Sequence, residues 1–88
     1  MMNDELSEPT YSTRDLGLGT FLITVNHELT GTTLEDPRKV ILHFRRQKNT
    51  DSLILSYFNG TAQAPAKKLF ENYRTLRGLI YTRTNNVR

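Results

Sequence analysis

The sequence of 88 residues contains no cysteine, which excludes both a disulfide framework and a thiolate metal site as supports for the fold. A chain without cysteine suits a reducing compartment. The first residues lack the basic and apolar regions of a signal peptide, and no apolar run approaches the roughly 20 residues that a membrane-spanning helix requires. We therefore expect a soluble cytoplasmic protein without a membrane partner.

A chain this short has little core to stabilise it. A domain of this size buries only about 60 to 65% of the surface that its unfolded chain exposes, and ordering the backbone costs roughly 1 to 2 kcal/mol per residue. Fully burying a large apolar side chain contributes about 1.5 to 3 kcal/mol. Almost all of the Leu, Ile, Val, Phe and Tyr side chains must therefore be buried, or a partner must cover the remainder.

Positive charge is nearly absent from the first half of the chain. Residues 1–36 contain one cation, Arg14, and seven acidic side chains, whereas residues 37–88 contain eleven Lys or Arg and two acidic side chains. The two parts carry −6 and +9, and the whole chain carries +3. This split predicts either an anionic partner for the second half or an acidic half that lies against the basic one.

The spacing of apolar residues predicts a first helix that begins at Ser12 or Thr13 and ends near Val25. Either residue is a good helix cap, and Asp15 would lie in the first turn. The expected apolar positions are Leu16, Leu18, Phe21, Leu22, Ile23 and Val25. Because these positions cover two sides of the helix, we expect it to be sandwiched in the interior, with Gly17 and Gly19 allowing another element to pack closely. Asn26 can adopt the left-handed conformation that ends a helix.

The segment 39–48 is the clearest strand of the sequence. Its residues Val40, Leu42 and Phe44 alternate along the chain and therefore lie on one face. The preceding segment 27–34 is rich in Thr, and the turn between them contains Asp-Pro, so an antiparallel hairpin is expected. A two-stranded ribbon is marginal by itself, so helices must pack on the apolar face.

Two helices are expected after the hairpin. The first runs from Thr50 or Asp51 to Gly60, which can adopt the left-handed conformation that ends a helix. The second begins at Pro65 and continues to about Tyr81. Its expected core face consists of Ala66, Leu69, Phe70, Tyr73, Leu76 and Ile80.

The predicted fold class is α+β, with a helix, a two-stranded antiparallel hairpin, a short helix and a C-terminal helix packed on one face of the hairpin. Residues 1–10 are polar and acidic, contain a proline and show no periodicity, so a flexible acidic tail is expected there. Residues 11–82 form a single α+β domain in this interpretation. Residues 83–88 form a C-terminal tail.

Several segments share their order and spacing with a known family. They are Tyr11–Leu16, His27–Leu29, Gly31, Tyr57–Gly60 and Pro65–Tyr81. Together they resemble a family of small domains of unknown function found in bacteria, phages and archaea. The resemblance covers about residues 11–82 and implies the α+β layout. Members often carry Lys in place of Arg14 and Gly in place of Asn26, and the family supplies no catalytic or binding residue to transfer.

The leading candidates for a binding surface are cations at the two ends of the second strand and on the last helix. The candidate nucleic-acid-binding residues are Arg38, Lys39, Arg45, Arg46, Lys48, Arg74 and Arg77. Cations bind phosphates whatever the base sequence, because each neutralised phosphate releases condensed counterions. Strand ends of small domains are also charged to stay solvated and to discourage edge pairing. The sequence does not decide between these two explanations.

Aromatic and histidine side chains have both functional and structural interpretations. Tyr57, Phe58 and Tyr81 are candidates for stacking on single-stranded bases, but their helical spacing favours core packing. His27 and His43, the only histidines, lie in different predicted strands and outside any dense pattern of Asp or Glu. Structural histidines are therefore favoured over metal ligands, and we expect no metal and no cofactor.

No motif points to catalysis. A nuclease needs clustered carboxylates to hold a metal ion, whereas Glu35 and Asp36 lie in a predicted turn. The Gly-Leu-Gly sequence at 17–19 lies within a helical pattern and lacks both the third glycine and the lysine of a phosphate loop. None of the serines has a visible partnership with a histidine and an acid. We therefore expect a protein that is not an enzyme and has no evident small-molecule ligand.

Two function classes remain. The first is a noncatalytic small binding module that engages nucleic acid, DNA or RNA, through a basic surface centred on Arg45, Arg46 and Lys48. The alternative is a protein–protein interaction or assembly module, for example a phage or mobile-element accessory protein that docks on an acidic host protein or pairs with itself. The thin core, an unpaired hairpin edge and the opposite charges of the two halves favour the alternative.

Overall fold

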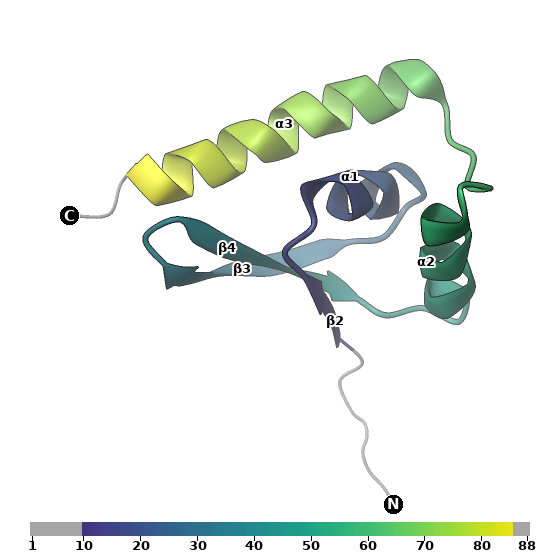
Figure 1. The fold of residues 1–88 in the computed structure, drawn as a ribbon, viewed down its shortest axis with the longest axis horizontal. Helices are drawn as coiled ribbons and strands as arrows, with labels where there is room; N and C mark the ends of the chain where they lie inside the picture. Colours follow the sequence, from purple (N-terminus) through teal and green to yellow (C-terminus); the bar gives the residue numbers. More distant parts are fainter. Residues whose placement is uncertain (1–9, 86–88) are drawn as a thin grey trace, which may run out of the picture.

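The computed structural model describes residues 10–85, which fold into a three-stranded antiparallel sheet and three helices (Figure 1). The elements are β2 (Thr10–Thr13), α1 (Leu16–Thr24), β3 (Leu29–Asp36), β4 (Lys39–Arg45), α2 (Thr50–Asn59) and α3 (Ala66–Asn85). The predicted α+β class is confirmed, but the sheet has three strands instead of two. Of the predicted tails, Thr10 belongs to β2 and residues 83–85 to α3. Residues 1–9 and 86–88 lie outside the described part of the chain.

The additional strand, β2, includes both residues that were predicted to cap the first helix. It pairs antiparallel with β4, with Tyr11 opposite Phe44 and Thr13 opposite Leu42. Tyr and Thr suit a half-buried strand, because aromatic and β-branched side chains pack well on a pleated surface. The tertiary pairing with β4 therefore decides the structure of this segment.

Helix α1 begins later than expected and has a different cap. The side chain of Asp15 accepts a hydrogen bond from the backbone N–H of Leu18 at 3.0 Å, which makes Asp15 the N-cap. The prediction that Ser12 or Thr13 caps this helix is wrong, because both residues belong to β2. A carboxylate at this position satisfies a free N–H and interacts favourably with the positive end of the helix dipole.

The central strand β4 supplies the floor of the core. The sheet order is β2-β4-β3, so β4 is paired on both sides. Val40, Leu42 and Phe44 are 6%, 0% and 0% exposed, which confirms their predicted place on the buried face. The predicted hairpin turn is also present, and its backbone N–H at Arg38 bonds to the carboxylate of Asp36 at 2.9 Å. Strand β3 extends to Asp36, two residues beyond the predicted strand end.

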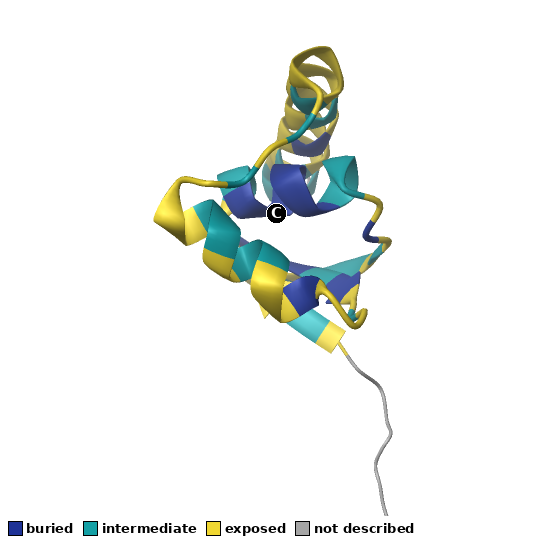
Figure 2. Ribbon diagram, turned by 90° about the vertical axis from the view of Figure 1, so that its right-hand side faces the viewer, coloured by how far each residue is buried: buried dark blue, intermediate teal, exposed yellow. Residues whose placement is uncertain are grey.

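Helix α1 lies between the sheet and α3 (Figure 1). An added Cβ at Gly19 would lie 2.7 Å from Leu42 Cδ1 on one side and 3.3 Å from Leu76 Cδ2 on the other. The predicted close packing at this glycine is therefore confirmed. Figure 2 shows buried residues on α1 and on the sheet beneath it. The core cluster consists of Leu18, Phe21, Leu22, Val40, Leu42, Phe44 and Leu76.

Both helix ends for which the sequence predicted a left-handed residue have one. Asn26, which follows α1, has φ 72°, and Gly60, which follows α2, has φ 77°. The start of α2 differs from the prediction, because Thr50 lies inside the helix and Asn49 occupies the cap position without a side-chain capping bond. Thr50 is fully buried and has another partner.

That partner is His27, which connects the end of α1 to the start of α2. His27 is 3% exposed, and its Nε2 lies 2.8 Å from Thr50 Oγ1. The same hydroxyl accepts a hydrogen bond from the backbone N–H of Gln47 at 2.8 Å. Burial lowers the pKa of His27 from its ordinary value of 6.5, and the nearby Val25 carbonyl opposes this shift. The imidazole is therefore held neutral in the folded protein at neutral pH.

The lowered pKa of His27 predicts a loss of stability in mild acid. As the pH falls through 6.5, the unfolded chain takes up a proton at this site and the folded chain does not, so the free energy of unfolding falls. The expected slope reaches up to about 1.4 kcal/mol per pH unit until the folded pKa is reached. Urea titrations between neutral and mildly acidic pH measure it.

A histidine variant assigns this slope to one side chain. His27→Gln is expected to flatten it even if the variant is less stable at every pH. His43→Gln changes the only other histidine of the chain and is expected to leave the slope in place. A slope that survives His27→Gln would contradict the assignment.

Helix α3 crosses α1 and continues over the hairpin (Figure 1). Its inner side is narrower than predicted: Leu76 is buried and Leu69 and Ile80 are partly buried, but Phe70 and Tyr73 are 63% and 38% exposed. The predicted core placement of these two aromatic residues is therefore wrong. None of the helices in residues 10–85 combines the length and apolar character needed to cross a membrane.

Candidate functional site

The predicted cations lie in three separate parts of the molecule. Arg38 is in the hairpin turn and Lys39 begins β4, whereas Arg45 ends it. A strand of seven residues separates these ends by about 20 Å at 3.3 Å per residue. Arg46 and Lys48 follow β4 in the loop that leads to α2. The two ends of β4 therefore do not form one cluster of cations.

Two of the three cations at the centre of the predicted site are already paired with acids. Arg45 Nε lies 3.0 Å from Glu28 Oε1, and Arg46 Nη1 lies 2.7 Å from Asp51 Oδ1. The Arg46 guanidinium also lies over the ring of Tyr11, 5.6 Å from its centre. Such exposed pairs contribute only about 0.2 to 1 kcal/mol. A phosphate at this strand end would nevertheless compete with both carboxylates.

The remaining predicted cations, Arg74 and Arg77, are exposed on α3. They follow Phe70 and Tyr73 by four residues each, which places each arginine one turn beyond an aromatic residue on the same flank. Tyr81, 69% exposed, follows Arg77 by another turn. This flank of α3 therefore carries aromatic and cationic side chains in alternation.

Every acidic side chain among residues 10–85 has an internal partner. Glu28, Glu35, Asp51 and Glu71 form ion pairs with Arg45, Arg14, Arg46 and Lys67, respectively. Asp15 caps α1, and Asp36 accepts the N–H of the hairpin turn. Within these residues, Arg74 and Arg77 therefore have no acidic partner.

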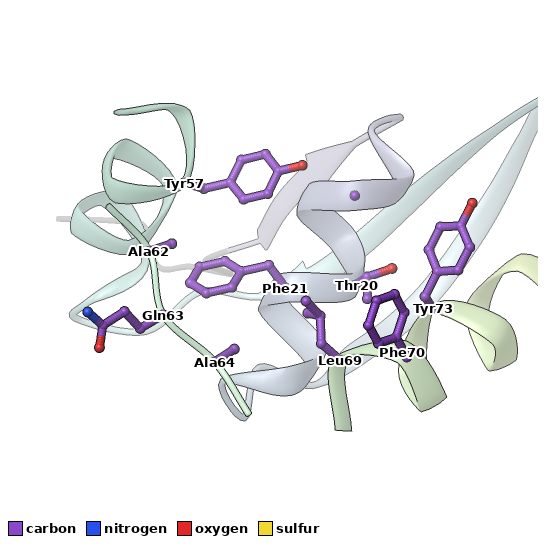
Figure 3. A pocket seen from close by; sticks show the side chains of 10 residues that line it. Thr20, Phe21, Tyr57, Ala62, Gln63, Ala64, Leu69, Phe70 and Tyr73 are labelled. Carbon is purple, nitrogen blue, oxygen red and sulfur yellow. The ribbon is translucent and has the colours of Figure 1, made fainter. Parts of the chain in front are cut away.

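A concave apolar site lies between α1, the end of α2 and the first turns of α3 (Figure 3). We call it the α1–α3 groove, and it encloses about 680 Å³. It is lined by Gly17, Thr20, Phe21, Tyr57, Ala62, Gln63, Ala64, Leu69, Phe70 and Tyr73. A volume of this size falls in the range of about 300 to 1,000 Å³ that is typical of ligand sites, and a mainly apolar lining with a few polar groups is typical as well.

The inner part of the groove is set by Tyr57 and Phe21. Their rings stack with centres 5.8 Å apart, and Figure 3 shows them on the side of the groove that faces α2. The Tyr57 hydroxyl contacts the position that a Cβ at Gly17 would occupy, so the glycine makes room for it. Burial raises the pKa of Tyr57, and the negative charge of Asp15 raises it further. The hydroxyl is therefore a hydrogen-bond donor throughout the physiological pH range.

The outer wall consists of Phe70 and Tyr73, which project from α3 beside Thr20 of α1 (Figure 3). The sequence pattern did not identify these residues as surface residues, because they continue the apolar stripe of the helix. The interpretation of Phe58 and Tyr81 as core residues is also wrong, since they are 64% and 69% exposed. One feature of the sequence could have identified these exposed residues. The last helix has more large apolar residues than a single packed side of a helix needs.

Comparisons with models of known protein families, with curated proteins and with solved structures found no match for this chain. The resemblance to a bacterial, phage and archaeal family stays a prediction. The functional conclusion therefore depends on the geometry of the described residues.

The open face of the sheet carries His43 between two hydroxyl groups. Its Nδ1 lies 2.7 Å from Ser12 Oγ, and its Nε2 lies 2.7 Å from Thr33 Oγ1. No carboxylate of residues 10–85 bonds this ring, whereas catalytic triads orient the histidine with an acid. Cross-strand hydrogen bonding on an exposed sheet face accounts for the arrangement. The structure reveals no group of three metal-ligating side chains within the same residues.

Proposed function

We propose that this protein is a noncatalytic protein-interaction module whose α1–α3 groove receives apolar side chains from a segment of a partner protein. The observation that carries the proposal is a groove of about 680 Å³ with Phe70 and Tyr73 exposed along its outer wall. This is the protein–protein alternative predicted from the sequence, now assigned to a different surface.

The amount of exposed apolar surface supports this proposal. Small monomeric proteins rarely expose contiguous apolar patches beyond a few hundred Å², and larger patches mark interaction sites. Among residues 10–85, the exposed large apolar side chains are Leu55, Phe58, Phe70, Tyr73, Leu79 and Tyr81. Six such residues are many beside the seven that form the buried apolar core of this part of the chain. A partner that covers the groove would bury part of this surface.

The side-chain types at the groove also support binding to protein. Tyr and Arg are enriched among the residues that dominate binding energy, and such residues cluster in well-packed pockets. Tyr57 and Tyr73 each offer a large ring and one hydroxyl, so they combine apolar contact with a hydrogen bond. The polar lining groups at Thr20 and Gln63 are neutral. The floor is therefore suited to side chains of a polypeptide more than to phosphate.

A peptide selected from a random library tests the proposal. Fluorescence polarisation would measure the affinity of a labelled selected peptide for the folded protein and for two matched variants. Phe70→Ala is expected to weaken binding by about 10- to 30-fold, because it removes a central aromatic contact. Leu55→Ala removes a large apolar side chain of nearly equal exposure, 62% against 63%, but Leu55 does not line the groove. Its expected effect is less than about twofold.

Equal effects of the two substitutions would contradict the assignment to the groove. A library that yields no binding peptide would contradict the proposed function itself. Circular dichroism on both variants verifies that the fold is retained, as expected for side chains that are mostly exposed.

Nucleic acid is the second candidate, and the alternation of Arg74 and Arg77 with aromatic residues on α3 favours it. Nonspecific single-strand binders combine stacking aromatic residues with a positively charged track. A labelled oligo(dT) strand tests this function. Binding should weaken steeply with salt, with a slope that falls by about 0.7 for each phosphate contact removed by Arg74→Gln or Arg77→Gln. Absence of binding at low salt would exclude it.

A further inference from the structure

We infer that the partner segment is acidic and that its carboxylates meet Arg74 and Arg77 while its apolar side chains occupy the α1–α3 groove. This inference rests on the proposed function. It adds the chemistry of the partner and the direction in which the segment lies. The charged side chains around the groove support this inference.

The two arginines lie just beyond the lining residues of the groove on the same helix, α3. Phe70 and Tyr73 form the outer wall, and Arg74 and Arg77 follow them at a spacing of four residues. Residues at this spacing are neighbours on a helix surface. A segment that places apolar side chains against the two aromatic rings therefore brings its adjacent residues within reach of the two guanidinium groups.

The rest of the described chain supplies no carboxylate to these arginines. All six acidic side chains of residues 10–85 are used in ion pairs, in a helix cap or in the hairpin turn. Helix α3 alone carries five Lys or Arg and one acid, Glu71, which is paired with Lys67. Carboxylates of a bound segment can therefore pair with the positive charge on this helix. Complementary charge also accelerates association and suppresses partners of the wrong sign.

One acid near the groove gives the segment a direction. Asp15 lies at the start of α1, with its Oδ1 3.3 Å from the position of a Cβ at Gly17. Its carboxylate accepts the N–H of Leu18 and caps the helix at this end of the groove. The acidic residues of the partner are therefore expected at the α3 end of the groove and not beside Asp15.

The same charges disfavour two other occupants. A second copy bound about a two-fold axis would place the same patch against itself, so Arg74 and Arg77 would face their own counterparts. Like charges across an interface cost binding energy. Nucleic acid would satisfy the arginines, but it would leave the apolar floor formed by Phe21 and Leu69 without apolar contacts.

Three synthetic peptides test the inference. They share one set of Leu and Phe residues at helical spacing and differ only at the positions between them, which are Glu, Gln or Lys. Fluorescence polarisation at low salt is expected to show the acidic peptide binding at least about tenfold more tightly than the neutral one. The basic peptide is expected to bind more weakly than both. Moderate salt should reduce the difference between acidic and neutral peptides, because salt screens exposed charges.

Two double variants assign the preference to the correct cations. Arg74→Gln with Arg77→Gln should abolish the preference for the acidic peptide and leave the affinity of the neutral peptide within about twofold. Arg38→Gln with Lys39→Gln removes the same formal charge at the hairpin turn and should preserve the preference. Both pairs are exposed, so both variants are expected to fold.

The outcomes separate the inference from the proposed function. Equal binding of the three peptides, with Phe70→Ala still weakening all of them, would overturn the inference and retain the groove as a protein-binding site. Binding of oligo(dT) without binding of any peptide would overturn both in favour of nucleic acid. If light scattering detected dimers and the peptide affinity depended on protein concentration because of them, the groove would be assigned to a second copy. That result would overturn the inference as well.

Discussion

Leu76→Ala is expected to lower the free energy of unfolding by about 2 to 5 kcal/mol. Leu76 is 1% exposed and is the only buried residue of α3, where it reaches both Gly19 of α1 and the core. Removing its side chain forfeits the transfer free energy and leaves a cavity between the helix and the body. A domain of this size has a total stability of roughly 0.05 to 0.15 kcal/mol per residue, so the substitution removes a large part of it.

Leu79→Ala is the matched control on the same helix. Leu79 is 40% exposed and lies on another flank of α3, so its replacement is expected to change stability by about 0.5 kcal/mol or less. Urea titrations monitored by circular dichroism measure both variants. Similar losses for the two leucines would show that α3 is not anchored through Leu76. Because α3 forms the outer wall of the groove, Leu76→Ala should also weaken peptide binding before the whole domain unfolds.

Gly19→Ala is expected to destabilise the fold by about 1 to 2 kcal/mol, although alanine is the better helix former. The new Cβ would lie 2.7 Å from Leu42 Cδ1, and Leu42 is 0% exposed and enclosed by other core side chains. Overpacking a core costs about 1 to 3 kcal/mol. The helix propensity gained on replacing glycine offsets up to about 1 kcal/mol of this cost.

Gly78→Ala on α3 supplies the opposite expectation. No atom lies within 4 Å of the position of its added Cβ, so only the gain in helix propensity remains. This substitution is expected to stabilise the protein by about 0.5 to 1 kcal/mol. The two glycine substitutions are expected to change the free energy of unfolding in opposite directions. Together they are therefore a sensitive test of the packing between α1 and its neighbours. If Gly19→Ala raised the unfolding midpoint as Gly78→Ala does, α1 would not lie as close to β4 as described.

Features determined by local chemistry could be predicted from the sequence. The alternation of Val40, Leu42 and Phe44 placed them on one face, because a strand has a period of two. The left-handed residues Asn26 and Gly60 followed from the preference of asparagine and glycine at helix ends. These properties depend on neighbouring residues along the chain and on no distant contact.

The third strand could not be predicted in the same way. The segment at Tyr11–Thr13 has both strand-forming residues and residues that cap helices, so its local preference is divided. Its structure is decided by pairing with β4, a contact between residues more than thirty positions apart, such as Ser12 and His43. A strand of 4 residues at the edge of a sheet is too short to show a clear alternation of apolar and polar residues.

The groove was missed for a related reason. The pattern on α3 identified six apolar positions, but a helix that crosses one neighbour buries only the positions near the crossing. Leu76 lies next to Gly19 of α1 and is buried, whereas Phe70 and Tyr73 lie earlier along α3 and line the groove. Which apolar positions are covered depends on the crossing of α1 and α3, and Gly19 permits that crossing. The same packing that stabilises the fold therefore creates the groove.

The basic surface was only partly predictable, because charge pairing is a tertiary property. The sequence places Arg45 and Arg46 in a dense cationic segment, but the fold brings Glu28 and Asp51 against them. Nothing in the residue pattern favoured the cations of α3 over those around β4. Their importance comes from the apolar groove beside them and from the internal use of every described acid.

The most direct test of the account is a two-dimensional NMR titration of the folded, isotope-labelled protein with the acidic peptide. We expect amide shift changes to concentrate on the groove, at Gly17, Thr20, Gln63, Phe70 and Tyr73, with the side-chain signals of Arg74 and Arg77 changing in parallel. Changes that gather instead at the hairpin turn or at the exit of β4, with the groove signals unmoved, would contradict it.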